Sequence, residues 1–154
     1  MTLRQPLITA VALALLALPA RATDPSVPTR YGTIGVANGI ALTYQGKSLS
    51  PPVTGNSGLQ VFPGSVYQLG DIDAVVVTDV GGSFCPSRFL VAAVSKKGIR
   101  VSKEFGNCSE AILTEVVGGK LIMTQSSKMK AGTLDRYVYD PALGVVMENG
   151  KAIR

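Results

Sequence analysis

Glycine-containing turn signals divide this chain into short segments, and their spacing constrains the fold more than any other sequence feature. The signals are Asn38-Gly39, Gln45-Gly46, Leu69-Gly70, Gly81-Gly82, Lys97-Gly98, Phe105-Gly106, Gly118-Gly119 and Asn149-Gly150. Glycine readily adopts the positive φ that tight hairpin turns require. Dense, regular turns of this kind predict strands joined by hairpins.

The segments between the turns have the side-chain pattern of β-strands. In IDAVVVTDV (72–80), Ile72, Ala74, Val76, Thr78 and Val80 alternate on one face, which is apolar except for the threonine, and we expect that face to be core. FLVAAV (89–94) is apolar on both faces, which predicts a strand covered on both sides. Only SEAILTEVV (109–117) is ambiguous, because Ser109 could cap a short helical turn. The predicted fold class is all-β, an antiparallel β-sandwich or small barrel made as a meander of about eight to ten short strands.

The first 22 residues have the pattern of a signal peptide. Arg4 precedes an apolar run at 7–18, and Ala20-Arg21-Ala22 is a small-x-small cleavage pattern, so we predict a cut after Ala22. The run is short for a bilayer span, and no second apolar segment of spanning length follows. We therefore expect a periplasmic or secreted protein without a membrane span. Residues 23–30 contain two prolines and are expected to be a flexible lead-in to a single all-β domain at 31–154.

The chain contains two cysteines, Cys85 in GGSFCPSRF and Cys108 in FGNCSE. Their separation excludes the C-x-x-C motif of redox enzymes. Two thiols in a small exported domain usually pair. We predict a structural disulfide that closes the open end of a hairpin turning at Lys97-Gly98, with a free reactive cysteine as the alternative.

Composition excludes several functions. The chain has no histidine, which removes Ser-His-Asp and Cys-His nucleophiles and histidine-ligated metals. After loss of Arg4 and Arg21, 13 basic and 10 acidic residues remain, a net charge of +3. Nucleic-acid binders carry a denser basic surface. We therefore expect no enzyme activity, no cofactor, no metal and no nucleic-acid partner.

Two short patterns offer chemistry that does not need histidine. Ser127 and Lys130 match S-x-x-K, in which a lysine activates a serine, but the match lies between strand-like segments and lacks the companion motifs. Asp71, Asp73 and Asp79 could suggest a calcium site or a carboxylate pair. Valines stand where further calcium ligands are needed, so we expect these carboxylates to face solvent at strand ends.

Three quoted segments, GGSFCPSRF, EFGNCSE and YVYD, resemble families of small exported proteins from Gram-negative bacteria that have no assigned activity. The resemblance covers the middle third of the mature chain. It implies a periplasmic address and supplies no catalytic residue. C-type lysozyme inhibitors carry an S-G-x-x-Y loop, from which this chain departs, since Leu59-Gln60-Val61 follows Ser57-Gly58.

Two polar segments are candidate partner-binding sites. The loop QSSKMKAG contains Ser126, Ser127, Lys128 and Lys130, and the basic hairpin contains Lys97 and Arg100. The first hypothesis is a non-enzymatic periplasmic binding protein whose loop contacts another protein, such as a cell-wall hydrolase that it inhibits or to which it confers immunity. The second is a structural envelope component that self-associates or contacts an anionic polymer through the hairpin.

Overall fold

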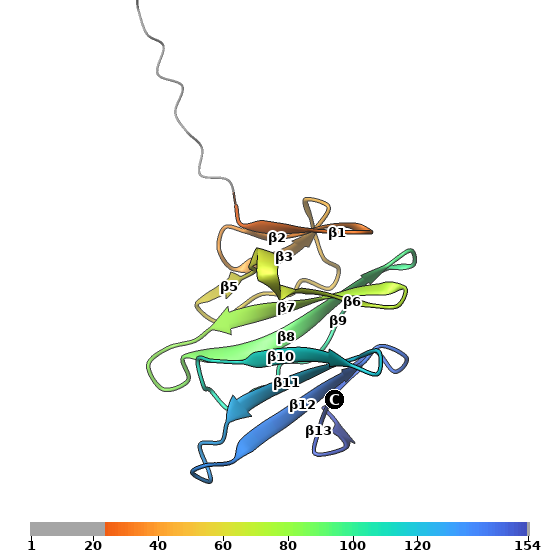
Figure 1. Ribbon diagram of the computed structural model, residues 1–154. Helices are drawn as coiled ribbons and strands as arrows, with labels where there is room; N and C mark the ends of the chain where they lie inside the picture. The colour runs from red at the N-terminus through yellow and green to blue at the C-terminus, as the bar shows by residue number, and fades with distance from the viewer. Residues whose placement is uncertain (1–23, 154) are drawn as a thin grey trace, which may run out of the picture.

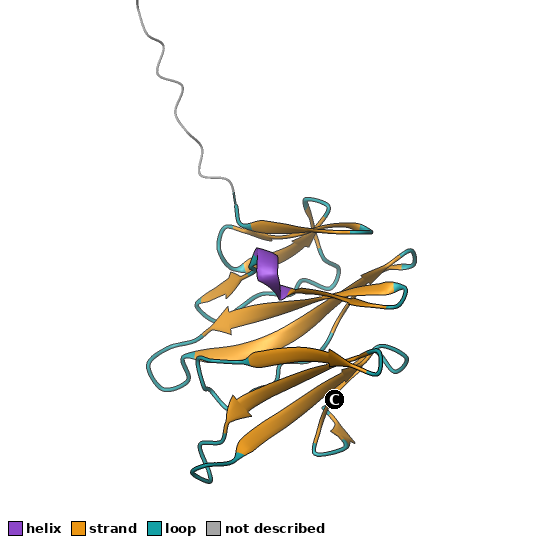
Figure 2. Ribbon diagram, in the orientation of Figure 1, coloured by secondary structure: helices purple, strands orange, loops and turns teal. Residues whose placement is uncertain are grey.

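The computed structural model describes residues 24–153, and the predicted signal peptide lies outside the described residues. The described chain consists of strands, turns and one 3-10 turn, and contains no α-helix (Figure 2). The elements are β1 (Ser26–Thr29), β2 (Gly32–Ala37), β3 (Ala41–Tyr44), β4 (Lys47–Ser48), β5 (Gly58–Gln60), η1 (Pro63–Ser65), β6 (Val66–Leu69), β7 (Ile72–Val80), β8 (Ser87–Ser95), β9 (Gly98–Val101), β10 (Leu113–Val117), β11 (Lys120–Ser126), β12 (Leu134–Asp140), β13 (Val145–Glu148) and β14 (Lys151–Ala152). Among these residues, none forms a helix that is long and apolar enough to cross a membrane.

The predicted all-β, antiparallel fold is confirmed. All strand pairs from β1–β2 to β13–β14 run antiparallel. The strand number exceeds the expected eight to ten because several strands span only two to four residues beside a turn. At Asn38-Gly39, Gln45-Gly46 and Asn149-Gly150 both residues have positive φ, as two-residue hairpin turns require.

The strands form three sheets that lie in layers (Figure 1). The N-terminal sheet has the order β1-β2-β3-β4, and the C-terminal sheet has the order β10-β11-β12-β13-β14. Between them lies the middle sheet, β5-β7-β8-β9, in which β6 pairs with the same strand β7 as β5. Sequence neighbours are therefore mostly sheet neighbours, as the predicted meander requires.

Both faces of the middle sheet are buried, each in a separate core. The aliphatic core packs the middle sheet against the N-terminal sheet and comprises Val27, Ile34, Val36, Leu42, Leu59, Val61, Val75, Val77, Leu90, Ala92 and Val94. The aromatic core packs the opposite face against the C-terminal sheet and comprises Leu69, Ala74, Val76, Phe89, Val91, Ala93, Phe105, Leu121, Met123, Tyr137, Tyr139 and Val146. The prediction that 89–94 is covered on both sides is confirmed. For 72–80 the expectation of one core face was wrong, because Val75 and Val77 are also fully buried.

The stretch expected as a flexible lead-in contributes a strand. Residues 26–29 form β1 and pair with β2, and Val27 is fully buried in the aliphatic core. Pro28 is compatible with this strand because β1 lies at the edge of its sheet, where a missing N–H does not break a ladder. The expectation was therefore wrong for these four residues.

Two of the aspartates expected to face solvent are buried. Asp73 is 1% exposed and Asp79 is 2% exposed. Asp73 accepts hydrogen bonds from the backbone N–H of Arg30 at 2.6 Å and from its Nε at 2.8 Å. Asp79 accepts one from the Asn56 backbone N–H at 2.8 Å. The prediction was wrong because both side chains point toward the N-terminal segment that covers β7, where backbone donors replace water.

Candidate functional site

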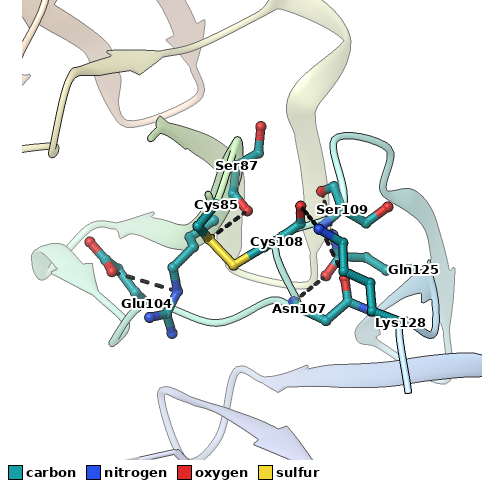
Figure 3. Close-up of a disulfide and its surroundings, with 9 residues drawn as sticks. Cys85, Ser87, Glu104, Asn107, Cys108, Ser109, Gln125 and Lys128 are labelled. Carbon is teal, nitrogen blue, oxygen red and sulfur yellow. Dashed lines mark hydrogen bonds and ion pairs between the residues drawn. A yellow bond between two sulfur atoms is a disulfide. The ribbon is translucent and has the colours of Figure 1, made fainter. Parts of the chain in front are cut away.

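The two cysteines form the predicted disulfide, which links the β7–β8 loop to the chain after β9 (Figure 3). The Cα atoms of Cys85 and Cys108 are 4.7 Å apart, and no free cysteine remains. Phe89 and Phe105 exchange backbone hydrogen bonds of 2.9 and 2.8 Å between them, which prolongs the β8–β9 hairpin toward the cysteines. The disulfide thus closes the open end of that hairpin, as predicted.

The segment around Cys108 is also held by buried polar side chains. Gln125, 2% exposed, accepts a hydrogen bond from the Asn107 backbone N–H at 3.0 Å and donates one to the Ser109 carbonyl at 2.8 Å. The Asn107 side-chain amide donates to the Asp135 carboxylate at 2.5 Å. Ser109 caps no helix, because irregular chain follows it until β10 begins at Leu113, and its N–H donates to the Asn107 side chain at 3.0 Å. This segment is therefore fixed to the C-terminal sheet as well as to the β7–β8 loop.

The polar loop predicted as a contact site lies against the disulfide. Loop 127–133 joins β11 to β12, and the Lys128 ammonium donates to the Cys108 carbonyl at 2.7 Å (Figure 3). The loop is closed by the Ser127 N–H, which donates to the Thr133 carbonyl at 2.9 Å. Ser126, the last residue of β11, accepts a hydrogen bond at its carbonyl from the Asn107 side chain at 2.8 Å. All four of these residues thus have defined partners, since the Lys130 carbonyl accepts a hydrogen bond from the Thr133 hydroxyl at 2.7 Å.

Two fully exposed apolar side chains flank this structure. Phe84 precedes Cys85 and is 99% exposed, and Met129 follows Lys128 and is 95% exposed. Phe84 is therefore adjacent in sequence to Cys85, which the disulfide fixes, and Met129 is adjacent to Lys128, which the hydrogen bond to Cys108 fixes. We call loop 81–86, segment 106–109 and loop 127–133 together the disulfide end.

Sequence reasoning did not select Phe84 or Met129. Two sequence features could have indicated these exposed side chains: an aromatic residue within the glycine-proline loop GGSFCP, and a methionine between two lysines in SKMK. Neither position belongs to an alternating strand segment, so neither side chain has a core to enter. The juxtaposition of the two loops depends on the pairing of distant sheets and has no local sequence signal.

An ion pair lies beside Cys85. Arg88 Nε is 3.8 Å from a Glu104 carboxylate oxygen (Figure 3). Burial raises the pKa of Glu104, and the buried carboxylate of Asp79 raises it further, while Arg88 opposes this effect. Glu104 therefore retains its proton to a higher pH than a free glutamate does.

The other predicted contact residues, Lys97 and Arg100, lie at the opposite end of β8. β8 runs for nine residues between the disulfide end and the β8–β9 turn, a length of about 26 Å at the usual strand rise. The structure therefore brings Ser126, Ser127, Lys128 and Lys130 to one end of the molecule, and Lys97 and Arg100 to the other.

Neither the S-x-x-K match nor the aspartate group has the surroundings that its predicted chemistry requires. Ser127 and Lys130 lie in a loop rather than on one face of a helix, and the Ser127 hydroxyl accepts a hydrogen bond from the Met129 N–H at 3.3 Å. Within residues 24–153, no group of three or more metal-binding side chains of the His, Cys, Asp or Glu type occurs.

Comparison of the chain with protein-family models, curated proteins and solved structures gave no match.

Proposed function

We propose that this is an exported, non-enzymatic binding protein of the periplasm, and that its disulfide end contacts another protein. The observation that carries the proposal is the pair of exposed apolar side chains, Phe84 and Met129, beside a cross-linked loop pair. The disulfide supports export, because such bonds persist in oxidising compartments.

Exposed apolar side chains on fixed loops have the properties of binding anchors. A large apolar side chain gains free energy when it leaves water, and aromatic residues are common among the few that dominate protein interfaces. Ordering a loop on binding costs conformational entropy, and a loop that is already fixed avoids much of that cost. The disulfide and the Lys128–Cys108 hydrogen bond restrict the motion of the loops that carry Phe84 and Met129.

The chemistry of the loops indicates the partner. Two apolar tips require an apolar crevice, and the ammonium groups of Lys128 and Lys130 require acidic groups at its rim. A protein with a deep groove, such as a cell-wall hydrolase, has this character, and an inserted loop would block it. Inhibition of, or immunity to, such an enzyme is therefore the form of binding that we propose.

The experiment compares variants in capture and affinity. Tagged wild-type protein, Phe84→Ala and Met129→Ala are used to capture partners from periplasmic extract, and the captured protein is purified for calorimetry. Each substitution should weaken binding about tenfold or more, because interface anchors contribute roughly 1.4 kcal/mol or more.

The matched control is Leu143→Ala, which removes an exposed apolar side chain (62% exposed) from the β12–β13 turn at the other end. It should bind as the wild type does. Equal capture by all four proteins would refute the proposed contact surface. Replacement of Ser126, Ser127, Lys128 and Lys130 by alanine then tests the remainder of the polar loop.

A further inference from the structure

A cavity opens between the middle and C-terminal sheets at the end of the molecule far from the disulfide. Its volume is about 410 Å³, and its lining includes Ile72, Ala93, Lys97, Arg100, Tyr139 and Pro141. The β8–β9 turn supplies one wall and the β12–β13 turn supplies the other. This volume lies within the range of small-molecule sites.

The walls of the cavity combine apolar surface with positive charge. Ile72, Ala93 and Pro141 provide apolar contacts, and Lys97 and Arg100 provide the charged groups. Among the described residues that line the cavity, none carries a carboxylate. The acidic Asp71 lies in a neighbouring hollow with Lys96 and Lys97.

Arg100 has no carboxylate partner in the described part of the chain. The ion pairs of residues 24–153 use Arg30, Arg88 and Lys120 as their cations. The nearby Asp140 is already occupied, because its carboxylate accepts hydrogen bonds from Lys120 at 2.6 Å and from the Ala142 N–H at 2.9 Å. The guanidinium therefore keeps its donors available.

The Arg100 side chain lies against the β12–β13 turn. A Cβ at Gly144 would lie 3.5 Å from Arg100 Nη1 and 3.8 Å from its Cδ, and Gly144 has φ +69°. Arg100 also lowers the pKa of Tyr139, while burial, the larger effect, raises it. These contacts place the positive charge at the cavity wall, next to the aromatic core.

We propose that this cavity binds a small organic anion, a carboxylate or phosphate monoester with a short apolar body. Arg100 receives the anionic group, because a guanidinium matches two oxygens of one carboxylate or phosphate. Lys97 adds charge at the rim, and the apolar body packs on Ile72, Ala93 and Pro141. This site is independent of the disulfide end and adds a ligand to the proposed binding protein.

The probes are hexanoate and phenyl phosphate, compared with hexanol and inorganic phosphate. Backbone amide signals are followed by NMR during titration of full mature protein. Hexanoate and phenyl phosphate should shift signals at 97–100 and 139–142, and should bind at least tenfold more tightly than hexanol or inorganic phosphate. A response to phenyl phosphate alone assigns a phosphate ligand, and a response to hexanoate alone assigns a carboxylate ligand.

Arg100→Gln should weaken hexanoate and phenyl phosphate binding at least tenfold while the thermal unfolding curve stays close to that of the wild type. Arg136→Gln is the matched control, since Arg136 is exposed on β12 and lines no part of the cavity. Phe84→Ala should also bind the probes normally. Equal binding by Arg100→Gln and wild type overturns the proposal, as does hexanol binding equal to hexanoate. Retention on heparin by a protein that binds neither small anion overturns it in favour of surface charge.

Discussion

The two faces of the middle sheet are attached to their neighbours by different chemistry. Toward the N-terminal sheet the contact is aliphatic, and its polar link is the ion pair between Arg30 and buried Asp73, 2.7 Å apart. Toward the C-terminal sheet the contact is aromatic, with Phe105 centred 5.2 Å from Tyr137. Its polar link is segment 106–109, which the disulfide joins to the β7–β8 loop and which Gln125 joins to the C-terminal sheet. The polar link of the N-terminal interface is therefore an ion pair, and that of the C-terminal interface includes a covalent bond.

This difference follows from the alternation of side chains along two strands. In β7 and β8, the odd and even positions point to opposite faces, so Phe89 enters one core and Leu90 the other. The ends of the same strands supply the links, with Asp73 near the start of β7 and Cys85 just before β8. One hairpin thus determines how both outer sheets are held.

The largest expected effect comes from truncating the aromatic core. Phe105→Ala should lower the free energy of unfolding by about 3–5 kcal/mol, because a large buried ring leaves a cavity that the core fills only partly. Leu42→Ala, in the aliphatic core, should cost about 2–5 kcal/mol. Urea unfolding measures both. A smaller loss for Phe105→Ala than for Leu42→Ala would contradict the expectation that the larger buried ring leaves the more costly cavity.

Removing the disulfide should lower the global stability and loosen segment 106–109 more than the N-terminal interface. The Cys85→Ala, Cys108→Ala double variant should lose roughly 3 kcal/mol through the added freedom of the unfolded chain. Hydrogen exchange should accelerate in segment 106–109 and leave β2 and β3 nearly unchanged. Thiol titration of denatured, unreduced wild-type protein should find no free thiol, and two free thiols would refute the cross-link.

Asp73→Asn should act on the N-terminal interface alone. The amide keeps the size of the side chain but loses the charge that strengthens its hydrogen bonds to Arg30. Thermal unfolding should begin several degrees earlier, with faster hydrogen exchange in β1 and β2. Asp71→Asn is the control, because Asp71 is exposed, and it should leave both measurements unchanged.

The smallest effect is a pH dependence of the aromatic core. Burial raises the pKa of Tyr137 to about 12, and the negative charges of Glu148 and Asp135 add to the shift. The unfolded value is about 10, so this contribution to stability is complete below pH 10 and is lost as the pH rises toward 12. In Tyr137→Phe the alkaline loss measured by denaturant unfolding should be smaller. An identical loss in both proteins would assign the alkaline effect to other groups.

Much of the fold could be predicted from local pattern. The glycine turns marked hairpins, the alternation in IDAVVVTDV marked a strand, and the apolar run at 89–94 marked a strand buried on both faces. Cys85 and Cys108 could be paired because the Lys97-Gly98 turn places their segments side by side. Each of these inferences depends on residues within one hairpin.

The parts that could not be predicted depend on pairing between sheets. Val75 and Val77 are buried because a separate sheet covers the second face of β7, which alternation within one strand does not reveal. Asp73 is buried because Arg30 meets it from 43 positions away. The contact of Lys128 with Cys108 is likewise set by the packing of β11 beside the hairpin, so the sequence showed a polar loop without showing where it lies.

The layered order of the sheets has a consequence for how the chain folds during synthesis, which begins at the N-terminus. β1 to β3 are made first, but Ile34, Val36 and Leu42 have no cover until β7 and β8 follow. Once residue 95 has been made, two layers can close around the aliphatic core while the C-terminal sheet is still absent. The growing chain then presents Phe89, Val91 and Ala93 to water until β11 and β12 arrive. The order of the strands therefore allows an intermediate of two layers with one apolar face exposed to water.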